Sequence, residues 1–225
     1  MKLLLALVAA ATMVGCSAGD GENVDRAPAP ASAAMRSRVA GPDKIDPPDF
    51  SKKTAIRMIR KGDEVRIGDS IESALRAFRE EKNAYKVAEM PAGWRDPAYS
   101  AQGWDNGTTG FGAIVFDDKV VFGLFHEERS DEGRLQEILA VYDRMLNMPA
   151  TNVVGSRVRY WFWQKDNHRL MISAVQPPTG GLSISIAMGH APIMDILGMN
   201  AKQAEKDRVA AESIFEESRK AMEKK

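Results

Sequence analysis

Cysteine is almost absent from this chain: Cys16 is the only one among 225 residues. With a single thiol the chain can form no internal disulfide, so its stability must come from a packed core. Net charge is absent too, because 31 Lys and Arg residues balance 31 Asp and Glu residues. A chain without net charge has no long-range field to collect a polyanion, which argues against nucleic acid as a partner.

Long apolar runs are also missing, apart from one at the N-terminus. Lys2 is followed by an apolar stretch from Leu3 to Val14, and small residues surround Gly15. This stretch is too short to span a bilayer and has the order of a signal peptide: a cation, an apolar segment and a cleavage site. No later apolar run approaches the length of a membrane span.

Met13-Val14-Gly15-Cys16 resembles the lipobox of bacterial lipoproteins. The resemblance implies cleavage before Cys16, which makes residues 1–15 a signal peptide, and attachment of a palmitate-type lipid anchor to Cys16. Cleavage removes Lys2 and leaves 30 basic against 31 acidic residues, with no free thiol for catalysis. The expected location is the cell envelope, at the outer membrane and facing the periplasm if the cell is Gram-negative. The alternative is an ordinary secretory signal with an incidental cysteine.

Residues 16–53 are rich in Ala, Pro, Ser, Gly and Asp, and they hold five of the eleven prolines. Few large apolar side chains are present to offset the entropy of ordering such a segment. The composition therefore predicts a disordered tether between the lipid and the folded domain.

The folded part is expected over residues 54–200, a length that suits a single domain. Capping-box spacing from Asp69 to Glu72 predicts a helix over residues 70–81, with Asp69 as its N-cap. Apolar runs at 111–116 and 119–125 predict a β-hairpin whose strands are covered on both faces.

Similar patterns follow in the second half. An apolar stripe predicts a helix over residues 131–147. Runs at 157–164 and 169–175 predict a second hairpin. Residues 182–188 alternate apolar with small or polar side chains and predict a strand buried on one face only.

Two further helices are predicted near the C-terminus. A short one begins around Pro192 and stops at Gly198. The other is a charged helix over residues 201–225 with only a thin apolar stripe, which either packs weakly on the domain or pairs with another chain. A third reading, a solvated appendage, is slightly favoured.

The order of elements predicts an α+β fold, with an antiparallel sheet of about five strands, helices packed on one face, and two α-β-β units over residues 70–125 and 132–188. It resembles the SmpA/BamE-like and β-lactamase-inhibitor-like α/β modules through Ile67-Gly68-Asp69-Ser70, which precedes the first predicted helix. The resemblance implies an envelope lipoprotein or a binding protein without catalysis.

The run Tyr160-Trp161-Phe162-Trp163 is the best candidate for a binding surface. As a strand, it places four side chains on one face: Arg157, Arg159, Trp161 and Trp163. Trp and Arg are enriched at protein interfaces, and Arg stacks on Trp. The alternative, which the sequence favours, is that helices cover this face and the Trp rings belong to the core.

Residues 83–110 are predicted to form a long loop, because Pro and Gly interrupt them. This segment contains three large aromatic residues that could pack on the domain, Trp94, Tyr99 and Trp104. It could act as the lid of a small-molecule pocket. Its Gly-rich end lacks the Lys-Ser/Thr of a phosphate-binding loop and leads into a strand, so no nucleotide cofactor is expected.

Candidates for metal or acid–base chemistry are few. A polar cluster follows one predicted strand: His126, Glu127, Glu128, Asp131 and Glu132. No second His lies at helical spacing from His126, and neither His168 nor His190 belongs to a metal-binding motif. No Ser lies in a Gly-x-Ser-x-Gly motif. No catalytic residue, metal site or cofactor is assigned from the sequence.

Two functions remain open at this point. The first is a lipid-anchored cell-envelope protein whose domain binds another protein without catalysing a reaction. The second is a small-molecule-binding domain or a hydrolase that uses residues 83–110 as a pocket lid. The sequence names neither the partner nor the ligand.

Overall fold

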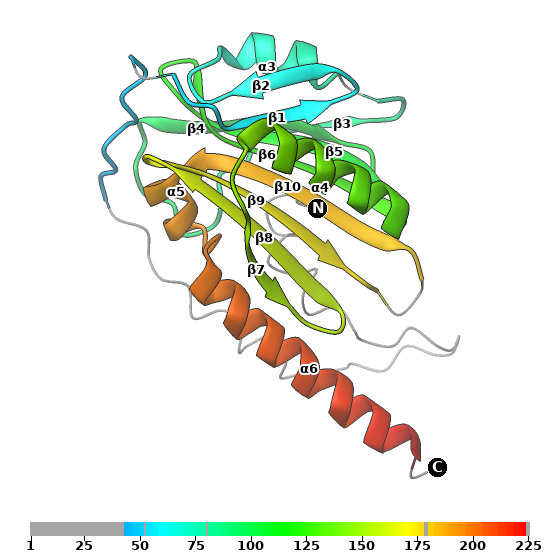
Figure 1. Cartoon of the computed structure of the whole chain (residues 1–225). Helices are drawn as coiled ribbons and strands as arrows, with labels where there is room; N and C mark the ends of the chain where they lie inside the picture. The colour runs from blue at the N-terminus through cyan, green and yellow to red at the C-terminus, as the bar shows by residue number, and fades with distance from the viewer. Residues whose placement is uncertain (1–42, 52, 80, 178–179, 224–225) are drawn as a thin grey trace, which may run out of the picture.

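An eight-stranded antiparallel sheet forms the centre of the molecule (Figure 1), with the strand order β3-β4-β5-β6-β10-β9-β8-β7. The structure is a computed structural model that describes residues 43–51, 53–79, 81–177 and 180–223. Cys16, the expected signal peptide and most of the expected tether lie outside the described residues. The α+β class is confirmed, but the sheet has eight strands rather than about five.

The first half of the domain begins with a small hairpin and a short helix, β1 (Arg57–Arg60), β2 (Asp63–Arg66) and α3 (Ile71–Ala77). Four sheet strands follow: β3 (Tyr85–Val87), β4 (Tyr99–Asp105), β5 (Thr109–Phe116) and β6 (Lys119–Ser130). The second half comprises α4 (Glu132–Leu146), β7 (Thr151–Val154), β8 (Val158–Lys165), β9 (His168–Val175) and β10 (Leu182–His190). Two helices complete the chain, α5 (Ala191–Ile196) and α6 (Ala201–Glu223).

Each half is thus a helix followed by four antiparallel strands, and the last strand of each half pairs with the other at the centre. In that central pair, Ile186 of β10 lies opposite Phe125 of β6. Sequence patterns predicted only two or three strands in each half, without β3, β4 and β7. These strands lack an apolar run, because β3 and β7 are short and β4 contains Gly103 and several polar residues.

The boundaries of the two predicted helices differ in accuracy. Asp69 was expected to cap the first helix, but its carboxylate accepts from the backbone N–H of Arg66 (2.7 Å). Ser70 is the cap instead, so α3 begins one residue later and ends at Ala77 rather than near residue 81. The prediction for α4 is confirmed, since Asp131 caps its start and Asn147, with a φ of 49°, ends it in the left-handed conformation.

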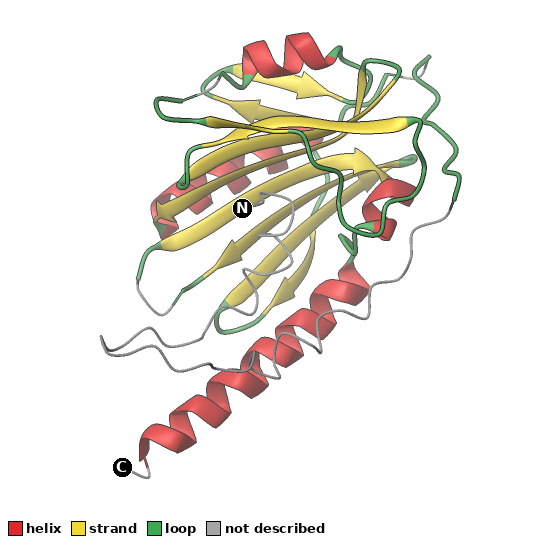
Figure 2. Cartoon of the chain, turned by 180° about the vertical axis from the view of Figure 1, so that it is seen from behind, coloured by secondary structure: helices red, strands yellow, loops and turns green. Residues whose placement is uncertain are grey.

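Helices cover both faces of the sheet, not one as expected. The face called here the α4 face packs against α3, α4 and the β1–β2 hairpin, through a core that includes Phe111, Ile172 and Trp163. The opposite face, called the α6 face, carries a second apolar cluster with α5 and α6 (Figure 2). Burial on two faces explains why both parities of the central strands are apolar. It also corrects the prediction for β10, because Ser185 and Ala187 are buried as well.

Part of the expected tether packs on the domain. Ile45 is 6% exposed, and its backbone N–H donates to the carboxylate of Asp96 (2.9 Å). Its carbonyl accepts from the hydroxyl of Tyr99 (3.1 Å). The ordered structure therefore begins before residue 54, which composition alone had suggested as the boundary.

The charged C-terminal helix α6 also contacts the domain. Its first turns lie against β7 and β8, and Ala204 is buried in the cluster of the α6 face. Arg208 forms ion pairs with Glu205 and Glu212 beside Gly155. Packing of these first turns differs from the solvated appendage that the sequence slightly favoured. Within the described ranges, no helix is both long and apolar enough to cross a membrane.

Candidate functional site

Trp161 and Trp163 lie on the same face of β8 but at different depths. Trp163 is 1% exposed, and its ring centroid lies 6.1 Å from that of Tyr142 in α4. The Tyr142 hydroxyl accepts from the backbone N–H of Ile59, which fixes α4 to the β1–β2 hairpin above Trp163. Trp161 is only half-buried. Of the two Trp residues in the expected binding face, the structure therefore leaves only Trp161 accessible.

The two Arg residues of that expected face have different surroundings. The Arg159 guanidinium donates two hydrogen bonds to the Glu132 carboxylate (2.9 and 2.7 Å) and lies 5.8 Å from the Trp161 ring centroid. Hydrogen bonds from Arg159 and Gln136 hold the pKa of Glu132 below its usual range. Arg157 lies half-buried just before β8, where its carbonyl accepts from the backbone N–H of Gln176. Arg159 therefore lies beside the Trp161 ring, with its positive charge neutralised by Glu132.

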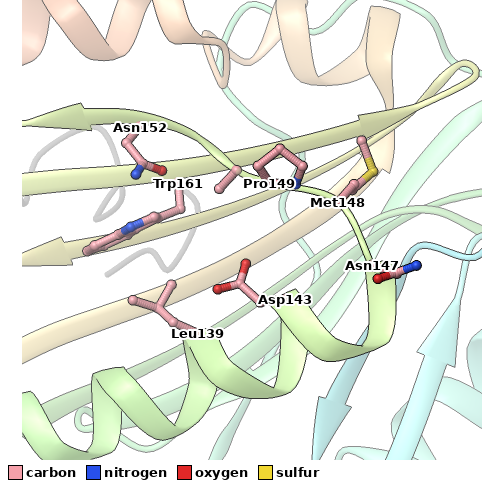
Figure 3. Close-up of a pocket in the computed structure, with 8 residues that line it drawn as sticks. Leu139, Asp143, Asn147, Met148, Pro149, Asn152 and Trp161 are labelled. Carbon is pink, nitrogen blue, oxygen red and sulfur yellow. The ribbon is translucent and has the colours of Figure 1, made fainter.

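A groove of about 520 Å³ opens beside Trp161, between α4 and the strands β7 and β8 (Figure 3). Its lining residues come from the second half of α4, the following loop and the two strands: Leu139, Asp143, Asn147, Met148, Pro149, Ala150, Asn152 and Trp161. In Figure 3, the Trp161 ring lies between Leu139 and Asn152, and the Asp143 carboxylate points from α4 into the groove.

Asp143 is the one charged residue in this lining. No ion pair or side-chain hydrogen bond joins its carboxylate to any residue within the described ranges. The groove therefore combines an aromatic ring, aliphatic walls and one uncompensated negative charge. Such a combination suits a side chain with an apolar stem and a positive head group.

The strand next to the groove, β7, lies at the edge of the sheet and pairs only with β8. Gly155 donates its N–H to the carbonyl of Val158, and hydrogen-bonded pairs alternate along an antiparallel ladder. By this alternation, Asn152 and Val154 direct their backbone N–H and C=O groups away from β8. Their side chains are exposed on the α4 face, and Val154 is 61% exposed.

The segment 83–110, expected as a long loop, contains strand at residues 85–87, 99–105 and 109–110, and of its three candidate aromatic residues Tyr99 and Trp104 are buried and Trp94 is half-buried. Trp104 lies in β4 with 1% exposure, and its indole N–H donates to the carbonyl of Phe78 (2.7 Å). Tyr99 begins β4, and burial raises the pKa of its hydroxyl to about 12. Trp94 packs edge-on against Tyr99 at 5.4 Å between the ring centroids. Residues 88–98 form its longest connecting segment, which packs on the α6 face through Met90 and Trp94.

A row of polar residues crosses the α6 face in direct cross-strand register. Ser173 lies opposite Ser185, and Ser185 lies opposite His126. His126 lies opposite Gly110, which lies opposite Asp105. We call Asp105, His126, Ser173 and Ser185 the polar row. No local sequence pattern predicts this arrangement, because residues on four separate strands come together only through the order of the sheet.

The polar row lacks the contact that acyl transfer requires. No hydrogen bond links the Ser185 hydroxyl to His126 within the described ranges, although a nucleophile and its base must be in hydrogen-bond reach. Burial lowers the pKa of His126, and the charges of Asp105 and Glu128 oppose this shift. His126 is therefore neutral at physiological pH.

The other two His residues, His168 and His190, are buried beside each other, with 6.1 Å between their ring centroids. Burial lowers the pKa of both, and each Nδ1 is buried without a hydrogen-bond partner in the described part of the chain. Among the described residues, no group of three or more His, Cys, Asp or Glu side chains is placed to hold a metal ion.

Comparisons with known proteins found no relative of this chain. No protein-family model matches the sequence. Searches of curated proteins and of solved structures likewise found no match.

Proposed function

We propose that this protein is a lipid-anchored cell-envelope protein whose domain binds another protein without catalysing a reaction. The binding site in this proposal is the groove beside Trp161 together with the free edge of β7. One observation carries it: a half-buried Trp, an uncompensated carboxylate and an open strand edge occur at the same place. Exposed Trp residues in such surroundings are frequent anchors of protein interfaces.

The anchor in this proposal is a lipid on Cys16, and the Pro-rich segment after it lets the domain reach partners near the membrane. The support is the sequence from Met13 to Cys16. Cys16→Ala should abolish labelling by a fatty-acid probe and leave an unprocessed or soluble precursor. Undiminished labelling of this variant would exclude the lipid anchor.

Photo-crosslinking in living cells tests the protein-binding role. A photoreactive residue at Asn152 should yield a discrete crosslinked product with a second protein. The control is Glu72, which is also exposed and lies on α3, away from the strands β7 and β8 that line the groove (Figure 1). A product at Glu72 and none at Asn152 would contradict the proposed site.

A second candidate function is the binding of a small molecule on the α6 face, and the polar row is the observation that favours it. Hydroxyl groups and a neutral imidazole in one row can orient a polar ligand by hydrogen bonds. Shortening the connecting segment 88–98 should abolish such binding and leave crosslinking at Asn152 intact. Retained ligand binding in the shortened variant would contradict this second function.

A further inference from the structure

We propose that the partner docks as a ninth strand on β7 and inserts a Lys or Arg side chain between Trp161 and Asp143. This inference rests on the proposed protein-binding role of the groove and adds the chemistry of the bound segment. Three features of the structure support it: the outward backbone groups of β7, the distance from the sheet edge to Trp161 and the charge of the groove.

The backbone of β7 offers hydrogen bonds to one more strand. Because Asn152 and Val154 direct their N–H and C=O groups outward, an extended segment can pair with both residues. No other backbone group within the described ranges pairs with them. Addition of a strand to an open edge supplies main-chain affinity, and adjacent pockets supply specificity.

The distance to Trp161 selects a long side chain. Trp161 lies directly opposite Asn152, one strand further from the edge. An added strand would lie two strand spacings, about 9–10 Å, from β8. A short side chain on that strand ends above Asn152, whereas an extended Lys or Arg side chain spans most of this distance along the groove.

The charge of the groove selects a cation. Arg159 is already neutralised by Glu132, so Asp143 leaves the lining negative. A Lys or Arg head group gains both the attraction of this carboxylate and contact with the Trp161 ring. A carboxylate in the same place would meet Asp143 without a compensating charge.

The protein contains a related arrangement at the corresponding position of its first half. There Trp104 lies opposite Lys86 of the edge strand β3, as Trp161 lies opposite Asn152. The Arg60 guanidinium lies 5.4 Å from the Trp104 ring centroid and forms an ion pair with Glu81. A ring, a guanidinium and a carboxylate thus already form a stable group within this fold.

Short peptides test the proposal on the purified mature protein. The first probe is an acetylated and amidated octapeptide of alternating Val and Lys, and the second replaces each Lys by Glu. A third probe carries N-methyl groups on alternate amides of the Val–Lys peptide, which removes its ability to pair on one edge. Binding is measured by calorimetry, and the contact site by NMR shifts of the Trp161 indole and the Val154 amide.

We expect the Val–Lys peptide to bind and to shift both signals, and the Glu and N-methylated peptides to bind at least about tenfold more weakly. Asp143→Asn should weaken binding about fivefold or more, whereas Glu137→Gln, on the same helix but outside the groove, should not. Val154→Pro, which removes the outward N–H, should abolish binding that Val154→Ala retains. Equal binding of the Lys and Glu peptides, or indifference to N-methylation, would overturn the proposal.

The outcomes also separate this inference from the proposed function. If crosslinking at Asn152 succeeds in cells but the Val–Lys peptide does not bind, the protein-binding role is supported and the proposed docking of a basic strand is wrong. If both fail, both proposals fall. A dimer in sedimentation experiments that Val154→Pro dissolves would show that the edge of β7 pairs with a second copy of this chain, which would also overturn the inference.

Discussion

Trp104 and Trp161 occupy corresponding positions in the two halves of the sheet, but Trp104 is buried and Trp161 is only half-buried. Each lies on the α4 face of the strand next to an edge, opposite the middle of that edge strand. Trp104 is buried beneath Phe78 and the β1–β2 hairpin, which contributes Arg60. Trp161 has no such cover, because the β1–β2 hairpin lies over the first half and the central strand β10 and does not extend to Trp161 (Figure 1).

This difference shows how one fold unit can serve two purposes. In the first half, the β1–β2 hairpin covers Trp104, so that this residue belongs to the core. In the second half, the same position remains a groove between α4 and the sheet. Both Trp rings have an Arg and a Glu nearby, Arg60 with Glu81 and Arg159 with Glu132. The same substitution can therefore be made at the Trp or the Glu of each half, and the two effects compared.

The largest effect is expected from Trp104→Ala. This side chain is fully buried and donates a hydrogen bond to Phe78, so its loss should cost about 3–5 kcal/mol of folding free energy. Urea unfolding of the purified domain measures the difference. A loss below about 1 kcal/mol would mean that the cover over Trp104 is not the stable core described here.

Glu81→Gln should have the next largest effect on stability. Burial raises the pKa of Glu81, but its hydrogen bond from Thr109 and the charges of Arg60 and Lys61 lower it more, so the carboxylate is ionised. Removing that charge leaves the buried Arg60 uncompensated and should cost about 1–3 kcal/mol. Glu132→Gln is the matched control and should cost about 1 kcal/mol or less, because the Arg159–Glu132 pair is more exposed.

Acidification should destabilise both halves through their buried His residues. The pKa of His126, His168 and His190 is lowered in the folded protein, so the unfolded chain binds more protons below its own pKa of 6.5. Stability should be complete above that pH and should fall as the pH drops, by at most about 1.4 kcal/mol per pH unit for each His that stays neutral.

Urea unfolding at pH 7.5, 6.5 and 5.5 measures this slope. The variant His190→Gln should reduce it, because it removes one imidazole whose pKa is lowered by burial and by the neighbouring His168. A stability that is flat, or that rises, between pH 7.5 and 5.5 would contradict the burial of these side chains.

A small effect on stability is expected from Trp161→Ala. Because this ring is half-buried beside an open groove, its removal should cost about 1 kcal/mol of folding free energy. In the peptide experiment, the same change should weaken binding about tenfold or more. A loss of stability equal to that of Trp104→Ala would assign Trp161 to the core and remove it from the binding site.

Local sequence patterns determined much of the central structure. The apolar runs around Asp117-Asp118 predicted β5 and β6, and these two residues adopt the positive φ angles of a tight hairpin turn (50° and 57°). Asp131 and Asn147 bound α4 because capping depends on residues adjacent in the chain. The strands β8 and β9 were found from their apolar runs and β10 from its alternation of apolar with small or polar residues, which are also local patterns.

Features that depend on partners far apart in the chain were not predictable. The short strands β3 and β7 exist because β4 and β8 supply their hydrogen bonds, not because of their own composition. Ser185 was expected to face solvent, yet helices and loops cover both faces of the sheet and it is 7% exposed. Ile45 was assigned to a tether, since nothing local indicates the Asp96 and Tyr99 that bind it.

The two Trp residues of β8 show how far the sequence predicts the position of a side chain. Alternation along a strand determined from the sequence alone that Trp161 and Trp163 share a face. Periodicity specifies the direction of a side chain but not its depth, because depth depends on what lies above the strand. Only the tertiary structure placed Tyr142 of α4 over Trp163 and left the space beside Trp161 open, with Asp143 and Asn152 at its walls.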